Sequence, residues 1–281
     1  MKKIPVIRTV QAAYQFVFTH LGQIMGLIWV PMVLVTVIGF FVEQRYYAAA
    51  ADALASNNFT RLGPPLLGMF GYFIAALLLY AMMYVPVIEL ARGQRKEAVL
   101  VHFNFGPLEW RLFRAMVGLL AFLLIAVLLS GFVIGAISSF AAASLALELL
   151  LALIYLALFY AIMRFVFLLP ALAVHEEGPL LPRAWSLSAG NFWRILAIMV
   201  ATMGPVALVA AMAELLLEGP QPLLPSVASS SAMAAAQLHR MSLNMPVSEG
   251  IGFLLAPLFL GLAAGASAAA LEALGKDTAE V

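Results

Sequence analysis

The stretch LLLALIYLALFYAIMRFVFLLPALAV occupies residues 149–174 and carries one charged side chain, Arg164. An α-helix rises about 1.5 Å per residue, so about 20 mainly apolar residues cross the ~30 Å hydrocarbon core of a bilayer. This stretch is longer than that. Its residues do not alternate between polar and apolar as the strands of a membrane barrel do. It therefore predicts a transmembrane helix.

Similar runs occur along the whole chain. Of the 281 residues, 64% are hydrophobic and 10% are charged, against roughly 45–50% and about 25% in an ordinary soluble domain. Fifteen basic and fourteen acidic residues cannot cover the exterior of a soluble protein of this size. We predict an all-α polytopic membrane protein in which residues 1–281 form a single integral membrane domain. The six spans are expected at about residues 21–42, 65–88, 115–137, 147–172, 195–217 and 250–272.

Basic residues next to the spans predict the orientation, because cytoplasmic loops are enriched in lysine and arginine. Eleven of the fifteen fall on one side of the six-span topology: Lys2, Lys3, Arg8, Arg92, Arg95, Lys96, Arg111, Arg114, Arg183, Arg194 and Lys276. Both termini are thus expected in the cytoplasm. The long connections on the other side, residues 43–61 and 218–249, are interpreted as outer loops, with a short helix around residues 232–241.

Amphipathic segments precede the first, third and fifth spans. In the first, Ile7, Val10 and Tyr14 share one helical face, which suits a helix at the membrane interface. Aromatic and basic residues also precede the other two spans. This alternation is compatible with three two-helix repeats, although the residue identities between them are also expected by chance in so apolar a chain. Gly261 and Gly265 form a G-x-x-x-G pair, which favours close helix packing.

The residues around the end of the fourth span form the candidate site. Pro170 is expected to kink or end the helix. A buried or interfacial Arg164 paired with Glu176 or Glu177 would fix the corner that follows. The alternative is an elbow with aromatic anchors and no ligand. The candidate residues are Arg164, Pro170, Glu176, Glu177, Trp185, Asn191, Trp193 and Arg194.

This order of residues resembles a known family. An arginine in span four, Leu-Pro-Ala at 169–171, an acidic turn, Ala-Trp-Ser-Leu at 184–187 and Asn-Phe-Trp-Arg at 191–194 are similar to bacterial six-span proteins. These are grouped with the membrane domain of glycerophosphoryl diester phosphodiesterases and their stand-alone, largely uncharacterised relatives. The resemblance implies a multi-pass protein of the bacterial inner membrane. It carries over no catalytic residue, and the soluble phosphodiesterase domain is not in this sequence.

Motifs for catalysis or cofactor binding are not found in the sequence. There is no cysteine, and the four histidines lack the spacing of a metal site. Neither a nucleophile elbow nor a phosphate-binding loop occurs. Glu89, Glu148, Glu214 and Glu218 lie near span ends and are interpreted as solvated. We therefore expect no enzyme activity, no cofactor, no metal and, at a net charge of +1, no nucleic acid partner.

Two functions remain open. Prolines in or beside the spans can free backbone carbonyls along a path through the membrane, which favours transport of a lipid, a small amphiphile or a peptide. These prolines are Pro31, Pro86, Pro170, Pro205 and Pro257. The alternative is a non-enzymatic accessory or scaffold subunit of an envelope complex. The expected partners are membrane lipids, together with envelope proteins or further copies of the chain.

Overall fold

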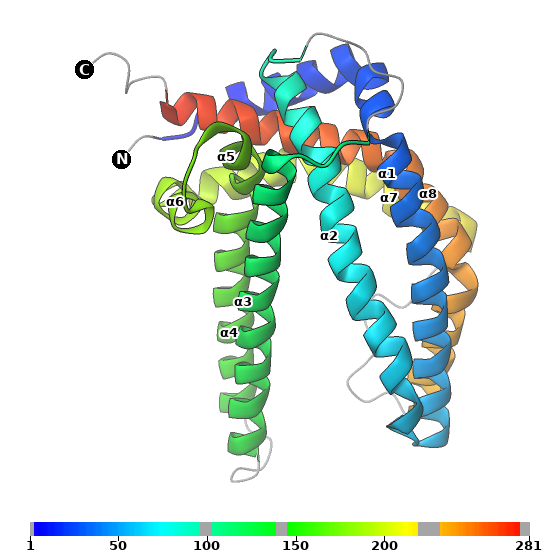
Figure 1. The fold of residues 1–281 in the computed structure, drawn as a ribbon. Coiled ribbons are helices and arrows are strands. Elements are labelled where there is room, and N and C mark those ends of the chain that lie inside the picture. The colour runs from blue at the N-terminus through cyan, green and yellow to red at the C-terminus, as the bar shows by residue number, and fades with distance from the viewer. Residues whose placement is uncertain (1–2, 96–102, 139–144, 219–230, 276–281) are drawn as a thin grey trace.

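The computed structural model describes residues 3–95, 103–138, 145–218 and 231–275, and within these ranges it contains helices and no strand. The helices are α1 Val6–Ser56, α2 Gly63–Ala91, α3 Pro107–Ser138, α4 Leu145–Val166, α5 Leu169–His175, α6 Leu180–Ser188, α7 Phe192–Glu218 and α8 Ser231–Gly275, with a short 3-10 helix at Phe59–Leu62 (Figure 1). The predicted all-α fold is confirmed.

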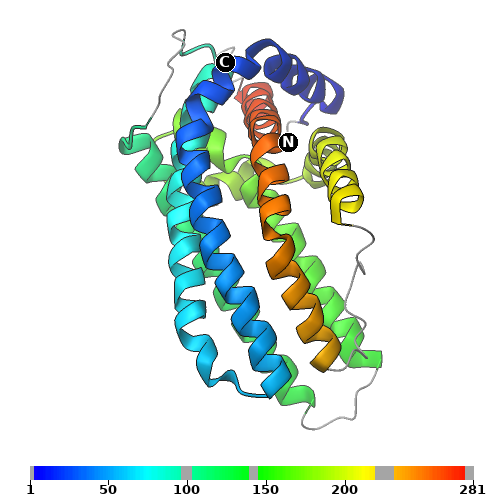
Figure 2. The same ribbon diagram turned by 90° about the vertical axis from the view of Figure 1, so that its right-hand side faces the viewer.

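Six helical segments are long and apolar enough to cross a membrane, as predicted. Large apolar side chains such as Leu216 and Leu254 are mostly exposed along them, at 81% and 74%. Such a surface is suited to lipid rather than to water. Helix α1 begins and α8 ends at the same end of the bundle (Figures 1 and 2), which we call the terminal end; the opposite end is the distal end.

Helix α1 is bent at His20, whose backbone is not helical (φ −118°, ψ 15°). The segment before the bend lies across the terminal end of the bundle (Figure 1). Ala13 and Val17 are buried there, whereas Ile7 and Phe18 are exposed. The predicted amphipathic segment is therefore continuous with the first span and turns at the bend.

Helices α1 and α8 share the largest interface in the molecule (Figure 2). A Cβ atom at Gly261 would lie 2.8 Å from Val17 Cγ2. A Cβ atom at Gly265 would lie 2.9 Å from Phe16 Cδ1 and 3.2 Å from Ala13 Cα. Only glycine allows the two helices to approach so closely, so the predicted packing role of this pair is confirmed.

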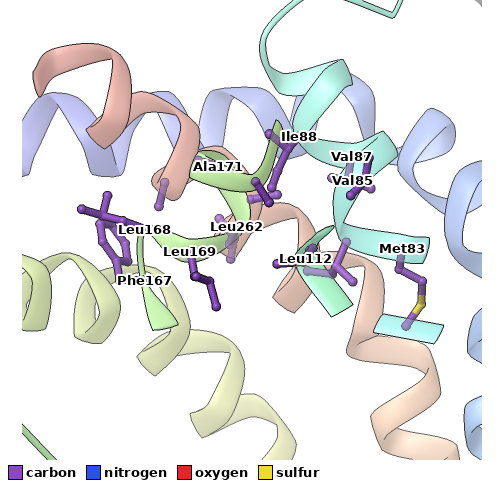
Figure 3. Packing of buried hydrophobic residues seen from close by; sticks show 14 of the residues in the cluster. Met83, Val85, Val87, Ile88, Leu112, Phe167, Leu168, Leu169, Ala171 and Leu262 are labelled. Carbon is purple, nitrogen blue, oxygen red and sulfur yellow. The ribbon is translucent and has the colours of Figure 1, made fainter. Parts of the chain in front are cut away.

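The fourth span is interrupted where Pro170 predicts a break. Helix α4 ends at Val166, and α5 begins at Leu169 with Pro170 in its first turn. Figure 3 shows α5 residues of the buried core, among them Leu169 and Ala171, together with Ile88 and Leu262. The buried core thus includes the short helix α5, which touches α2, α3 and α8.

The two long outer connections were predicted wrongly. Helix α1 continues to Ser56 instead of ending near residue 42, and residues 231–249 belong to α8. Both extensions are rich in alanine, which has the highest helix propensity. The separate short helix expected at residues 232–241 is the first part of α8, while residues 219–230 lie outside the described ranges. The arrangement as three two-helix repeats stays a prediction.

Candidate functional site

Arg164 lies at the end of α4 and is 6% exposed. Its Nε donates a hydrogen bond to Ser188 Oγ at 3.0 Å and its Nη1 to the Tyr160 hydroxyl at 3.2 Å, while Nη2 donates to the carbonyl of Trp185. The guanidinium also stacks over the Trp185 ring, 3.6 Å from its centroid. Arg164 therefore joins α4 to the last turn of α6.

The predicted pairing of Arg164 with Glu176 or Glu177 is wrong. Glu176 instead forms two hydrogen bonds with Arg183, at 2.8 and 3.2 Å, and its backbone carbonyl accepts one from Arg111 at 2.6 Å. Glu177 is exposed. The physical reason is that the last turn of a helix presents carbonyl groups and the negative end of the helix dipole, which attract a cation. The last turn of α6 supplies that environment to Arg164.

Two further corner residues, Asn191 and Arg194, hold the backbone of Ile4 near the beginning of the chain. The backbone N–H of Ile4 donates to Asn191 Oδ1 at 3.0 Å, and Arg194 donates to the carbonyl of Ile4 at 2.8 Å. Trp193 is 77% exposed and does not share this cluster. Of the predicted residues, Trp185 thus contacts Arg164, and Asn191 and Arg194 bond to Ile4. Pro170, Glu176, Glu177 and Trp193 belong to neither group. The contacts of both groups favour a structural elbow over a ligand site.

A cavity of about 590 Å³ lies among α1, α2, α7 and α8, and the sequence did not predict it. We call it the polar chamber. Its wall contains two carboxylates, four phenols and one hydroxyl: Glu43, Tyr47, Tyr72, Tyr80, Tyr84, Ser248 and Glu249. On α8 the wall extends from Met245 to Ala263, about 27 Å along the helix axis. The chamber therefore reaches from the distal part of the bundle well into its interior.

Gly39 makes room for two of the polar groups. The Tyr72 hydroxyl and Glu249 Oε1 lie 2.6 and 3.4 Å from the point that a Cβ atom at Gly39 would occupy. The two oxygen atoms therefore converge on one bare patch of α1. Glu249 and Glu43 form no ion pair or hydrogen bond with any residue in the described ranges. Both carboxylates are left available to a ligand.

A second cavity of about 350 Å³, the apolar chamber, lies closer to the terminal end. Its wall includes Leu112, Met116, Leu119, Leu123, Phe167, Pro170, Met199 and Thr202. Thr202 uses its hydroxyl to donate to the carbonyl of Ile198 at 2.7 Å, which leaves the wall almost wholly apolar. Tyr84, Met203 and Ala263 line both chambers. The polar and apolar chambers are therefore neighbours that share part of a wall.

A third cavity, of about 620 Å³, lies at the terminal end. Several of its polar groups bond to one another: Arg92 Nη2 lies within hydrogen-bond distance of His175 Nδ1, at 2.8 Å, and Arg183 forms an ion pair with Glu176. Of the predicted corner residues, only Glu176 lines it. This pairing makes the third cavity a weaker candidate than the two chambers.

The two chambers offer polar and apolar side chains that can contact a ligand. In the described ranges, no group of three or more His, Cys, Asp or Glu side chains could hold a metal ion. The sequence did contain one signal for the polar chamber. Tyr80 and Tyr84 are four residues apart and Tyr72 lies two such steps earlier, so the three share one face of α2. Glu43 and Glu249 are charged residues at the edges of apolar runs, so the sequence places them at the ends of the predicted outer loops.

Comparison of the chain with protein-family models, with curated proteins and with solved structures gives no match. The function is therefore inferred from the residues that line the chambers.

Proposed function

We propose that this multi-pass membrane protein binds an amphiphile and moves it through the bilayer. The observation that carries the proposal is the wall shared by the two chambers at Tyr84, Met203 and Ala263. A polar compartment beside an apolar one matches a molecule with a polar head and an alkyl tail. Both volumes fall in the range of about 300–1,000 Å³ that is typical of small-molecule sites.

Prolines next to the chambers support movement. Pro170 lines the apolar chamber. Pro205 and Pro257 lie inside α7 and α8, close in sequence to Met203 and Ala256 of the polar chamber. Pro205 and Pro257 each remove one helical hydrogen bond and weaken their helix locally, whereas Pro170 begins α5 directly after the break from α4. The walls can thus deform more easily than those of uninterrupted helices.

The expected location follows from the basic residues and from the family resemblance. We place the protein in the bacterial inner membrane with both termini in the cytoplasm. The polar chamber is then closer to the outer face and the apolar chamber to the cytoplasmic face. The resemblance to the membrane domain of glycerophosphoryl diester phosphodiesterases is part of this proposal, and no hydrolysis is included in it.

A leaflet-exchange assay tests the proposal. The full chain is reconstituted in phosphatidylcholine vesicles containing a fluorescent single-chain lysophosphatidylcholine, whose head carries a quaternary ammonium, and dithionite quenching measures the exchange rate. We expect faster exchange than in empty vesicles. Ala263→Phe, which fills the shared wall, should reduce the rate to that of empty vesicles, whereas Ala207→Phe on the exposed face of α7 should not.

Equal rates in vesicles with and without the wild-type protein would contradict the proposal. They would favour the second function, a scaffold subunit of an envelope complex. One observation supports that alternative. Ile7, Phe18 and Trp193 are all more than two-thirds exposed at the terminal end, where a partner protein could cover them.

A further inference from the structure

The polar chamber has a single sign of charge. Glu43 and Glu249 line it, and its described wall contains no lysine, arginine or histidine. A third carboxylate, that of Glu214, lies next to the lining. Its Oε1 accepts a hydrogen bond at 3.2 Å from Ser248, which lines the chamber. A low-dielectric cavity that carries unpaired carboxylates attracts a cation and repels an anion.

The aromatic side chains of the lining also favour a positively charged ligand. Tyr47, Tyr72, Tyr80 and Tyr84 come from two helices and line the same cavity as the carboxylates. The faces of aromatic rings attract cations, and cages of such rings bind quaternary ammonium groups. The carboxylates and the rings are independent features of the wall, and both select a positively charged head.

The surface of α1 at Gly39, which carries no side chain, leaves room for the charged head group of a ligand. The hydroxyl of Tyr72 and Oε1 of Glu249 both come close to this glycine, from α2 and α8 respectively. A primary ammonium can donate to both oxygens, while a quaternary ammonium can contact them without hydrogen bonds. An alkyl tail can extend past Tyr84 and Ala263 into the apolar chamber. Among the described residues that line this chamber, the hydroxyls belong to Tyr84 and Thr202, and that of Thr202 is already hydrogen bonded.

We infer that the ligand is a lipophilic cation, with an amine or quaternary ammonium head in the polar chamber and an alkyl tail in the apolar chamber. This inference rests on the proposed function and specifies its substrate class. The head is held by Glu43, Glu249 and the tyrosine rings. The tail is held by apolar contacts alone.

Equilibrium binding to the full chain in phosphatidylcholine nanodiscs tests the inference, with binding to empty nanodiscs subtracted. The probe is radiolabelled dodecyltrimethylammonium, and dodecanol is a neutral competitor with the same tail. We expect the cation to bind at least about tenfold more tightly than dodecanol. Glu249→Gln and Glu43→Gln should each weaken binding of the cation by about tenfold or more, because each removes one negative charge that attracts the ammonium inside a low-dielectric cavity.

Matched variants separate the roles. Asp52→Asn removes an exposed carboxylate from the same helix as Glu43 but outside the chamber, so it should leave the affinity unchanged. Tyr80→Leu should weaken binding of the cation and leave competition by dodecanol intact. In each variant, competition by dodecanol shows that the apolar chamber is still folded.

The outcomes distinguish the two proposals. Equal affinity for the cation and for dodecanol, or wild-type affinity in both glutamine variants, overturns the inference and leaves the proposed function standing. If neither amphiphile binds, both the inference and the proposed function fail. A preference for the cation that both glutamine variants lose supports the inference.

Discussion

Replacement of Arg164 by alanine should destabilise the protein more than any exposed arginine replacement. The side chain is buried and donates three hydrogen bonds, two to residues of α6 and one to Tyr160 of its own helix α4. Its guanidinium also stacks on the ring of Trp185. Hydrogen bonds to charged groups contribute about 1.5–3 kcal/mol each and do not add fully. The Trp185 carbonyl keeps a second donor, the Ser188 hydroxyl at 3.1 Å.

From these contacts we expect Arg164→Ala to lower the free energy of unfolding by about 3–5 kcal/mol. At about 2–4 °C per kcal/mol, the midpoint of thermal unfolding should fall by roughly 10 °C. Arg164→Lys keeps the charge but loses the planar guanidinium and its stacking. Its midpoint of thermal unfolding should therefore lie between those of the wild type and Arg164→Ala. Arg240→Ala is the control, since Arg240 is exposed on α8 and its loss should change stability by no more than about 0.5 kcal/mol.

The assay heats the purified protein in detergent and measures the fraction that remains monodisperse by size-exclusion chromatography. This readout avoids tryptophan fluorescence, which the loss of the Arg164 contact with Trp185 would itself change. If the midpoint for Arg164→Ala lies within about 2 °C of that for Arg240→Ala, the assignment of Arg164 as the link between α4 and α6 is refuted.

Three further predictions concern other parts of the chain. Asn191→Ala should lower stability by about 1–3 kcal/mol, measured by the same heating assay, because the buried N–H of Ile4 loses its acceptor; an unchanged midpoint would contradict this. Gly39→Ala should displace the Tyr72 hydroxyl and weaken dodecyltrimethylammonium binding with little loss of stability, since alanine favours the helix; unchanged affinity would show that this patch is not used. Reporter fusions at the two termini should both give cytoplasmic signals, and a periplasmic signal from either would exclude the proposed orientation.

Much of the fold follows from local properties of the sequence. The apolar runs predict the six spans because lipid requires long helices, and Pro170 marks the break between α4 and α5 because it cannot continue the hydrogen-bond pattern. The helix ends were predicted less well. Charged residues such as Glu43 and Glu249 were used to place the ends of spans, but a charged residue does not end a helix. Helices α1 and α8 therefore extend beyond the expected spans.

The sites depend on contacts between distant segments, which local patterns do not contain. A carboxylate was the expected partner of Arg164, yet the orientation of α6 brings a carbonyl, a hydroxyl and an aromatic ring to it. The polar chamber joins Glu43 of α1 to Glu249 of α8, which are more than two hundred residues apart. The spacing of the tyrosines on α2 could have indicated a polar helix face, but no prediction was based on it.

Photo-crosslinking tests the central claim, that the two chambers hold one amphiphile, most directly. The probe is a dodecyltrimethylammonium analogue with a diazirine at the end of its tail, added to the full chain in nanodiscs and followed by peptide mass spectrometry. We predict crosslinks to apolar-chamber residues such as Leu119, Leu123 and Met199, which excess unlabelled dodecyltrimethylammonium abolishes. Crosslinks confined to lipid-facing residues such as Leu216 and Leu254, unaffected by competitor, would contradict the claim.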